Sequence, residues 1–218
     1  MLSAGESPDA KGAAVLNISA NFDEAERLLS DLARKQLPYA TSLALNETAQ
    51  EVREAEEREI ENVFDRPTRF TKRGLFLRRA TKIRLTATVG VKRVQSEYLK
   101  MQVTGGVRRP RGQALVVPVG ARLNKHGNLP KGGLSRLKKR KGVFTASRSG
   151  LKGKHLPAGI YQRSGRKGSS KLKMLVAFEP RASYRKRYGY GPLALRVARN
   201  RFETAFVNGM RKALATAR

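Results

Sequence analysis

The chain has 218 residues, enough for a single domain with a sizeable hydrophobic core. It carries 46 Lys and Arg against 17 Asp and Glu, a formal net charge of +29. A charge of this size opposes compaction unless a polyanion or an acidic partner neutralises it, so nucleic acid or an acidic protein surface is the expected neighbour. The absence of cysteine excludes a disulfide framework and a cysteine-based metal site.

The charge is unevenly placed along the chain. Residues 1–65 hold 14 of the 17 acids and six Lys and Arg, whereas residues 66–218 hold three acids and 40 Lys and Arg. This asymmetry indicates two parts with different neighbours. We therefore predict a flexible tail over residues 1–20 and a single domain over 21–218, with a helical acidic part at 21–66 and a basic part at 67–218.

The sequence contains no apolar run near the ~18–20 residues that a membrane-spanning helix needs. Residues 1–10 contain acids where a secretory signal needs basic residues followed by an apolar run. We expect no membrane partner, and we expect the protein to be made and used in a cytoplasm, which the lack of cysteine also fits.

The N-terminal third is predicted to be helical. The tail contains a short apolar patch at residues 15–18 that suits a strand, and Asn21 is a candidate N-cap. Apolar residues at helical spacing predict a helix over 22–36. Pro38 is expected to end that helix and to open a second one over 38–64.

The pattern changes after residue 68. Residues 68–74 suit a single turn, and strict alternation of apolar and polar residues over 83–91 predicts a strand. Residues 94–103 are compatible with a short helix or an extended stretch. Further short strands are expected at 113–119, 143–147, 159–163 and 172–178.

A last helix is predicted over 193–215. We expect it to pack through an apolar stripe formed by Leu195, Ala198, Phe202, Ala205, Phe206 and Met210. The fold class that follows is α+β, with N- and C-terminal helices packed on a small, mainly antiparallel sheet that carries long basic loops.

The central region is basic and rich in glycine. From Tyr98 to Phe178 there is no acid but 20 Lys and Arg, and 13 of the 20 glycines lie between Gly105 and Gly168. The strongest basic run is the expected loop at 121–142, and a second spans 163–173. The candidate residues for binding nucleic acid or a partner are Arg122, Lys125, Lys131, Arg136, Lys138, Lys139, Arg140, Lys141, Arg163, Arg166 and Lys167.

These basic loops have three possible interpretations. Lys and Arg displace counterions when they contact phosphates, so the loops could bind a nucleic-acid backbone without reading its sequence. They could instead dock on an acidic protein surface, or form an ordinary solvated face. We favour phosphate contact, with loops that order when the partner is bound.

Catalysis is not expected. Both histidines, His126 and His155, lie in basic glycine-rich segments without a nearby acid, and only three acids follow residue 65. The glycine clusters match neither the phosphate-binding loop nor the dinucleotide fingerprint. We predict no catalytic residue, no metal, no cofactor and no small-molecule substrate.

Two further segments leave alternatives open. The run at 184–190 interleaves tyrosines with Arg and Lys, which suits either base stacking or tyrosines packed on the last helix; we favour packing. The acidic stretch at 51–61 is either a docking face for a basic neighbour or a solvated helix surface, and we favour the solvated surface.

The order of these elements, together with several short sequence segments, resembles the prophage minor tail protein Z family and related tail-completion proteins of long-tailed phages. The resemblance covers roughly residues 22–215. The segments that carry it are Phe22–Ala25, Leu43–Ala49, Arg66–Phe70, Arg78–Lys82, His155–Arg163, the strand at 172–178, the Tyr/Arg cluster ending at Tyr190 and the C-terminal helix with Phe202, Ala205 and Phe206.

The resemblance implies a structural virion protein that acts in tail completion and head–tail joining. It implies a place in the tail or neck of the particle, beside the tail terminator, other connector proteins and viral DNA. A homo-oligomeric ring closed by heterologous contacts is expected there. The main alternative is a non-specific nucleic-acid-binding protein outside a virion, although no helix-turn-helix, zinc pattern or RNA-binding signature is present. A nuclease or integrase is a weaker third possibility, disfavoured by the missing acids.

Overall fold

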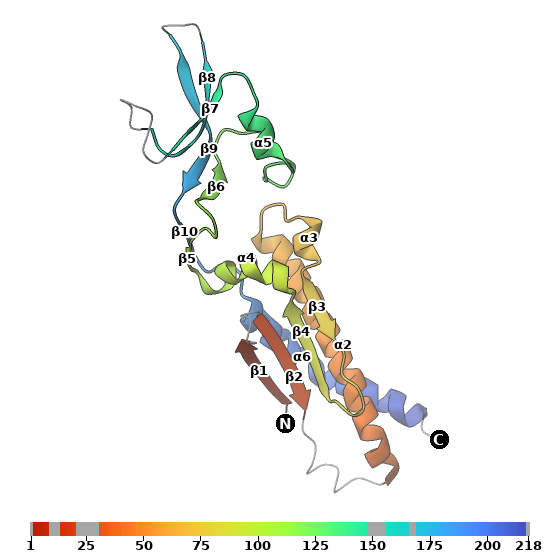
Figure 1. The fold of residues 1–218 in the computed structure, drawn as a ribbon. Coiled ribbons are helices and arrows are strands. Elements are labelled where there is room, and N and C mark those ends of the chain that lie inside the picture. The colour runs from red at the N-terminus through yellow and green to blue at the C-terminus, as the bar shows by residue number, and fades with distance from the viewer. Residues whose placement is uncertain (1, 9–13, 21–30, 148–155, 166–168, 217–218) are drawn as a thin grey trace. The chain divides into compact units, whose positions relative to one another are not determined.

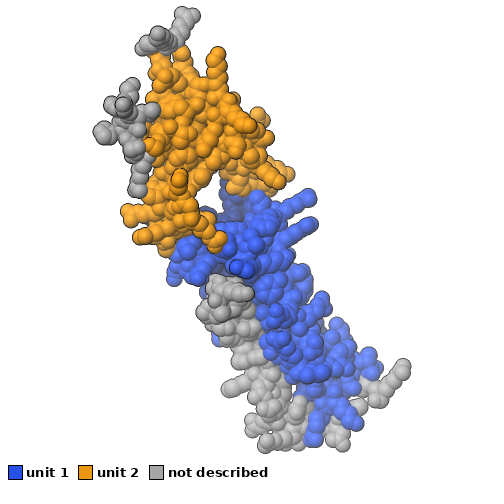
Figure 2. Space-filling view, in the orientation of Figure 1, with its two compact units in different colours: residues 1–105, 185–218 blue, residues 106–184 orange. Residues whose placement is uncertain are grey.

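A computed structural model describes residues 2–8, 14–20, 31–147, 156–165 and 169–216 (Figure 1). The chain forms two compact units, coloured separately in Figure 2. Unit 1 comprises Met1–Gly105 and Arg185–Arg218, and unit 2 comprises Gly106–Tyr184. The acidic-to-basic change near residue 66 is not the boundary between them, because residues 67–105 belong with the long N-terminal helix.

Unit 1 combines helices with one antiparallel sheet. Its helices are α2 (Asp31–Val63), α3 (Arg69–Lys72), α4 (Arg93–Thr104) and α6 (Tyr190–Ala215). Its strands, in the spatial order β1-β2-β4-β3, are β1 (Leu2–Pro8), β2 (Ala14–Ala20), β4 (Thr86–Val91) and β3 (Leu75–Arg78).

The first two strands correct the prediction of a flexible tail, while the apolar patch at 15–18 lies in a strand, β2, as its pattern suggested. Ala14–Ala20 pairs with β4 over five register positions, from Val15 opposite Gly90 to Ser19 opposite Thr86. The physical reason is that β4 would otherwise present unpaired N–H and C=O groups along one side. Strand β3, which pairs with the other side of β4, was not predicted.

Helix α2 is continuous through Pro38, so the predicted helix break at this residue is wrong. Proline has no N–H to donate to the carbonyl four residues earlier, and in a helix interior it costs about 3 kcal/mol. The residues around Pro38 are buried: Leu37 is 3% exposed, and Ala40 and Thr41 are fully buried. Packing on both sides of the proline therefore outweighs the missing hydrogen bond. The first part of the predicted helix, residues 22–30, lies outside the described residues.

Helices α2 and α6 approach each other through small side chains. The fully buried positions on α6 include Ala194, Ala198 and Ala213, whereas Phe202 and Phe206 are only partly buried. A Cβ atom built on Gly209 would lie 2.7 Å from the carbonyl oxygen of Ala40 on α2. The predicted stripe is therefore confirmed at Ala198 and Ala205, which are buried, and at Phe202, which packs against the core cluster. It missed Ala194, Gly209 and Ala213, where only small residues allow the close approach to α2.

The sheet packs on this helix pair. Ala87 and Val89 of β4 join Leu45, Ala49 and Val52 of α2 in one buried cluster, which also includes Ala80, Ala194 and Ala198. The strand begins at Thr86, three residues later than the predicted residue 83. Ile83 is 99% exposed because it lies in the turn that precedes the strand.

That turn is tied to α2 by one side chain. The Asn46 amide donates to the carbonyl of Ala80 at 3.0 Å, and its oxygen accepts from the Ala80 amide at 2.7 Å. A single amide side chain thus satisfies both backbone groups of Ala80, which lets this residue be buried without an unpaired polar group.

Unit 1 contains a second hydrophobic core cluster. Residues 93–104 form helix α4, which settles the open assignment, and Leu99 packs with Ile60, Leu75, Val91 and two tyrosines. Tyr188 is 2% exposed and Tyr190 is fully buried, with its hydroxyl donating to the carbonyl of Val89 at 2.8 Å. The favoured interpretation of these two tyrosines as packing residues is confirmed.

Unit 2 is an insertion between α4 and α6. Its entering and leaving segments, β5 (Gly106–Arg108) and β10 (Ala182–Tyr184), pair with each other as a two-stranded antiparallel ribbon. Between them lies a four-stranded antiparallel sheet in the order β6-β9-β8-β7, with one short helix. The strands are β6 (Leu115–Pro118), β7 (Val143–Ala146), β8 (Gly159–Ser164) and β9 (Lys171–Glu179), and the helix is α5 (Gly133–Lys138).

These strands match the predicted positions, but the prediction of one common sheet is wrong. β4 belongs to the sheet of unit 1, and the other four predicted strands form the sheet of unit 2. The fold class is α+β, as predicted, with long helices near both ends of the chain and small antiparallel sheets.

One carboxyl group is buried inside unit 1. Glu56 of α2 is fully buried and lies near the hydroxyl of Tyr188. Burial raises the pKa of Glu56 to about 8, and the Tyr188 hydroxyl offsets only part of that shift. The side chain is therefore mostly protonated at neutral pH.

Gly209→Ala is expected to lower the free energy of unfolding by about 1–3 kcal/mol, because the added methyl group meets the Ala40 carbonyl. Helix propensity alone would favour Ala by about 1 kcal/mol. Chemical denaturation would measure the change. Gly112→Ala is the matched control, since a Cβ there meets nothing within 4 Å. A more stable Gly209→Ala protein would contradict the close contact.

Glu56 predicts a pH dependence of stability. The pKa of Glu56 is about 8 in the folded protein, above its usual value of 4.5. Its stabilising contribution to folding is therefore full below pH 4.5 and is lost as the pH rises through about 8. The total decrease in stability is on the order of 5 kcal/mol. Glu56→Gln should therefore become more stable than the native chain as pH rises across this window. Denaturation of both proteins at several pH values would test it; a constant difference would refute it.

Candidate nucleic-acid interface

The basic segment at 121–142 is an ordered part of unit 2 and not a projecting loop. Leu134 and Leu137 of α5 pack into a core cluster with Ile160, Leu175 and Val176 of the sheet. Ala121 and Leu129 pack against the same cluster. The expectation of an irregular loop is corrected here, because apolar residues interspersed among the cations anchor the segment.

Helix α5 separates apolar and basic residues. Leu137 is 9% exposed, whereas Arg136 and Lys138 are exposed on the same short helix. The Arg136 guanidinium also donates to the carbonyl of Lys131 at 2.8 Å, which ties the segment before the helix to its first turn. The leucines thus hold the helix while its cations face solvent.

The turn after α5 brings a distant cation close. The amide of Arg140 donates to the Leu137 carbonyl at 3.1 Å, and that of Val143 donates to the Arg140 carbonyl at 3.1 Å. The amide of Arg163 on β8 donates to the Gly142 carbonyl at 2.7 Å. Gly142 has φ of +76°, and an added Cβ would lie 2.9 Å from the Arg163 carbonyl oxygen, so this close approach requires glycine.

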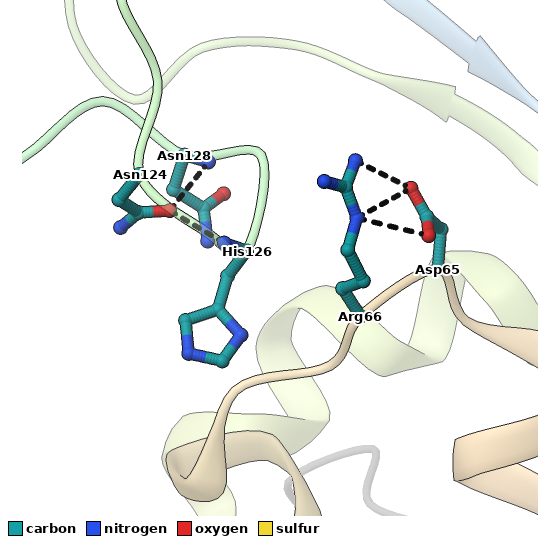
Figure 3. Close-up of polar contacts among 5 residues, drawn as sticks. All are labelled: Asp65, Arg66, Asn124, His126 and Asn128. Carbon is teal, nitrogen blue, oxygen red and sulfur yellow. Dashed lines mark hydrogen bonds and ion pairs between the residues drawn. The ribbon is translucent and has the colours of Figure 1, made fainter.

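A second turn displays Lys125. The Asn124 side-chain oxygen accepts from the amides of His126 and Asn128 at 2.9 and 3.0 Å (Figure 3). The Asn124 amide donates to the Asn128 carbonyl at 2.8 Å, which closes the loop. Such Asx-type bonding holds residues 124–128 in a tight turn and leaves Lys125 exposed.

All nine predicted binding residues that the structure describes are exposed. They are Arg122, Lys125, Lys131, Arg136, Lys138, Lys139, Arg140, Lys141 and Arg163. Arg166 and Lys167 lie outside the described residues. The backbone bonds bring Arg163 to the turn at 139–142, while Lys125 is placed by a separate turn.

The list of candidate residues omitted the cations at the start of β9, although the predicted basic run at 163–173 includes them. Lys171 and Lys173 are exposed at the start of β9, and Lys173 lies beside Gly120, where an added Cβ would approach its Cε within 2.8 Å. Alternation along this strand was the available signal, because apolar Leu172 separates the two lysines.

Unit 2 carries almost only positively charged side chains. Residues 106–184 contain 20 Lys and Arg and one acid, Glu179, a net charge of +19. Internal neutralisation is therefore impossible for almost all of these cations. A surface of this kind concentrates anions and binds polyanions with a strong dependence on salt.

In unit 1, several acidic residues form ion pairs with cations of the same unit. Glu51 pairs with Arg201 at 2.8 Å, Glu61 with Lys72 at 2.5 Å, and Glu57 with Arg53 at 3.7 Å. Asp65 pairs with Arg66 at 3.0 Å just after α2 (Figure 3). Much of the acidic stretch at 51–61 is thus engaged by cations of the same unit.

Other kinds of site find little support in the described part of the chain. It contains no group of three or more His, Cys, Asp or Glu that could hold a metal ion. None of its helices is long and apolar enough to cross a membrane. His126 belongs to the Asn124 turn, and His155 lies outside the described residues.

Comparison of the chain with protein-family models, curated proteins and solved structures finds no match. The interpretation of the basic surface therefore depends on its own chemistry and geometry.

Leu137→Ala should detach α5 from the sheet, because it removes the more deeply buried of the two leucine anchors. We expect unit 2 to become less stable by about 2–4 kcal/mol. Hydrogen exchange should also accelerate at the amides of Arg140 and Val143. Ser135→Ala, at an exposed position of the same helix, is the control. A destabilisation below about 1 kcal/mol would mean that α5 is not anchored.

Proposed function

We propose that this chain is a non-enzymatic structural protein whose unit 2 binds the phosphate backbone of nucleic acid without reading its sequence. The observation that carries this proposal is the +19 charge of unit 2, whose described cations are exposed on an ordered scaffold. Counterion release provides the free energy of such binding.

The ordered scaffold favours this function over a solvated surface. Arg136, Lys138 and the cations at 139–141 are held near the core by Leu134 and Leu137. Because the backbone is already placed, less conformational entropy is lost when phosphates bind. Helix α5 has only six residues, too short for the long recognition helix that reads bases in the major groove.

The biological setting that we propose is the neck of a tailed bacteriophage. The resemblance to tail-completion proteins supports this setting, as does the need for DNA or an acidic ring beside so basic a unit. In the neck, a homo-oligomeric ring would contact the tail terminator and other connector proteins, with unit 2 facing DNA or the adjoining ring. The alternative function is a non-specific nucleic-acid-binding protein outside a virion, which the same surface would serve.

Replacing Arg136, Lys138, Lys139, Arg140 and Lys141 by Ala should weaken duplex DNA binding. It should also flatten the slope of log affinity against log salt by up to ~0.9 for each phosphate that the variant no longer neutralises. Fluorescence anisotropy over a salt series would measure both quantities for duplexes of unrelated sequence.

The matched control changes five exposed cations of unit 1, namely Lys35, Arg196, Arg199, Arg211 and Lys212, so the net charge falls by the same amount. This control should keep most of the slope. Equal slopes for both variants would show a diffuse charge effect and refute a binding surface on unit 2.

The neck assignment predicts that the protein is retained in phage particles. Quantitative mass spectrometry of purified virions should find a small ring's worth of copies after salt washing and nuclease treatment. Absence from clean particles, with abundance in the cytoplasm, would refute the virion assignment and favour the alternative function.

A further inference from the structure

A basic depression with an apolar floor lies in unit 1, between α3 and the start of α4. It has a volume of about 450 Å³ and is lined by Arg69, Phe70, Arg73 and residues 92–95. None of these residues belongs to unit 2, and the proposed function does not use them. The depression is therefore a separate feature of the molecule.

The floor exposes apolar side chains that folding normally buries. Phe70 is 55% exposed and Val94 is 58% exposed. These two apolar side chains lie among the cations of the same lining, an arrangement that would complement a ligand carrying both flat rings and negative charge. Phe70 supplies an aromatic face on which a planar group can stack.

The backbone around Phe70 is held firmly. The buried Gln95 amide donates to the Phe70 carbonyl at 3.1 Å, and the Thr68 hydroxyl caps α3 by accepting from the Thr71 amide at 3.2 Å. The Tyr98 hydroxyl contacts the Thr71 hydroxyl at 3.1 Å. An exposed ring on a fixed backbone is preorganised for stacking, because little entropy is lost on binding.

The rim is entirely cationic. Arg69, Arg73, Lys92 and Arg93 are exposed, and the lining contains no acid. The Lys92 ammonium donates to the carbonyl of Arg73 at 2.8 Å, which joins the two sides of the depression. Four cations around an aromatic floor are complementary to a ligand with phosphates and flat, uncharged rings.

We propose that this depression binds single-stranded nucleic acid, with one base stacked on Phe70 and the flanking phosphates beside the four cations. A single strand fits because its base faces are open, whereas a duplex buries them in its own stack. The inference goes beyond the proposed function, since it assigns a second site, in the other unit, with a different preference. An acidic peptide would use the cations but would gain no base stacking.

The sequence allows a direct test because it contains no Trp. Phe70→Trp places a single indole reporter in the depression, and a stacked base should quench its fluorescence. Oligothymidylate should quench it, whereas a blunt-ended DNA duplex and a polyglutamate peptide should not. No quenching by oligothymidylate, or equal quenching by the duplex or the peptide, would overturn the proposal; quenching by the peptide would point to a protein partner.

A second measurement uses the native chain and labelled oligonucleotides. Phe70→Leu keeps an apolar side chain but removes the stacking face, so affinity for oligothymidylate should fall about tenfold or more. Affinity for the duplex should be unchanged. Val207→Ala, at another exposed apolar position of unit 1, is the control and should change neither affinity. An equal decrease in affinity for single strand and duplex would overturn the proposal.

The two proposals fail separately. The Phe70→Trp reporter is also measured in the chain with the five neutralised cations of unit 2. Quenching that survives there, together with an unchanged salt slope for duplex binding, would refute the function of unit 2 and keep the single-strand site. A flattened salt slope in that variant, with no quenching by oligothymidylate in either background, would support the function of unit 2 and refute the single-strand site.

Discussion

The close contact between α2 and α6 is the constraint on which unit 1 depends. Gly209 approaches the Ala40 carbonyl so closely that any side chain would collide with it, and alanines continue the contact along α6. The pair joins the long N-terminal helix to the C-terminal one and provides the surface on which β4 packs. Because the contact is continuous, α2 keeps its helical path through Pro38. Larger residues at these positions would separate the helices and open the core.

The same helix pair determines where the acidic residues of unit 1 lie. Glu56 is enclosed and protonated, and other glutamates of α2 pair with cations from α3 and α6. These exposed pairs contribute little stability individually, but they lower the local density of uncompensated charge. Unit 1 thus neutralises part of itself, whereas unit 2, with one acid, leaves almost all of its cations to an external anion.

The two surfaces proposed to bind nucleic acid follow different physical rules. In unit 2, leucines of α5 anchor a dense group of cations without an exposed aromatic ring in the helix, which suits phosphates of any sequence. In unit 1, fewer cations surround an exposed Phe70, which suits an open base. A protein with both surfaces could hold a duplex and an unpaired segment at once, an arrangement that would suit a position beside a DNA end.

The sequence by itself determined the α+β class, most strand positions, the last helix and the exposed basic residues of 121–142. Short-range patterns are sufficient for these, because alternation, helical spacing and high charge act locally. The tertiary structure alone decided that α2 continues through Pro38, that Gly209 of α6 meets the Ala40 carbonyl, and that the predicted strands divide between two sheets. It also decided that Leu134 and Leu137 anchor the basic segment, that Gly142 meets Arg163, and that Phe70 is exposed beside residues 92–95. Each of these depends on contacts between residues distant in the chain, whose packing energies exceed the local preferences that a sequence displays.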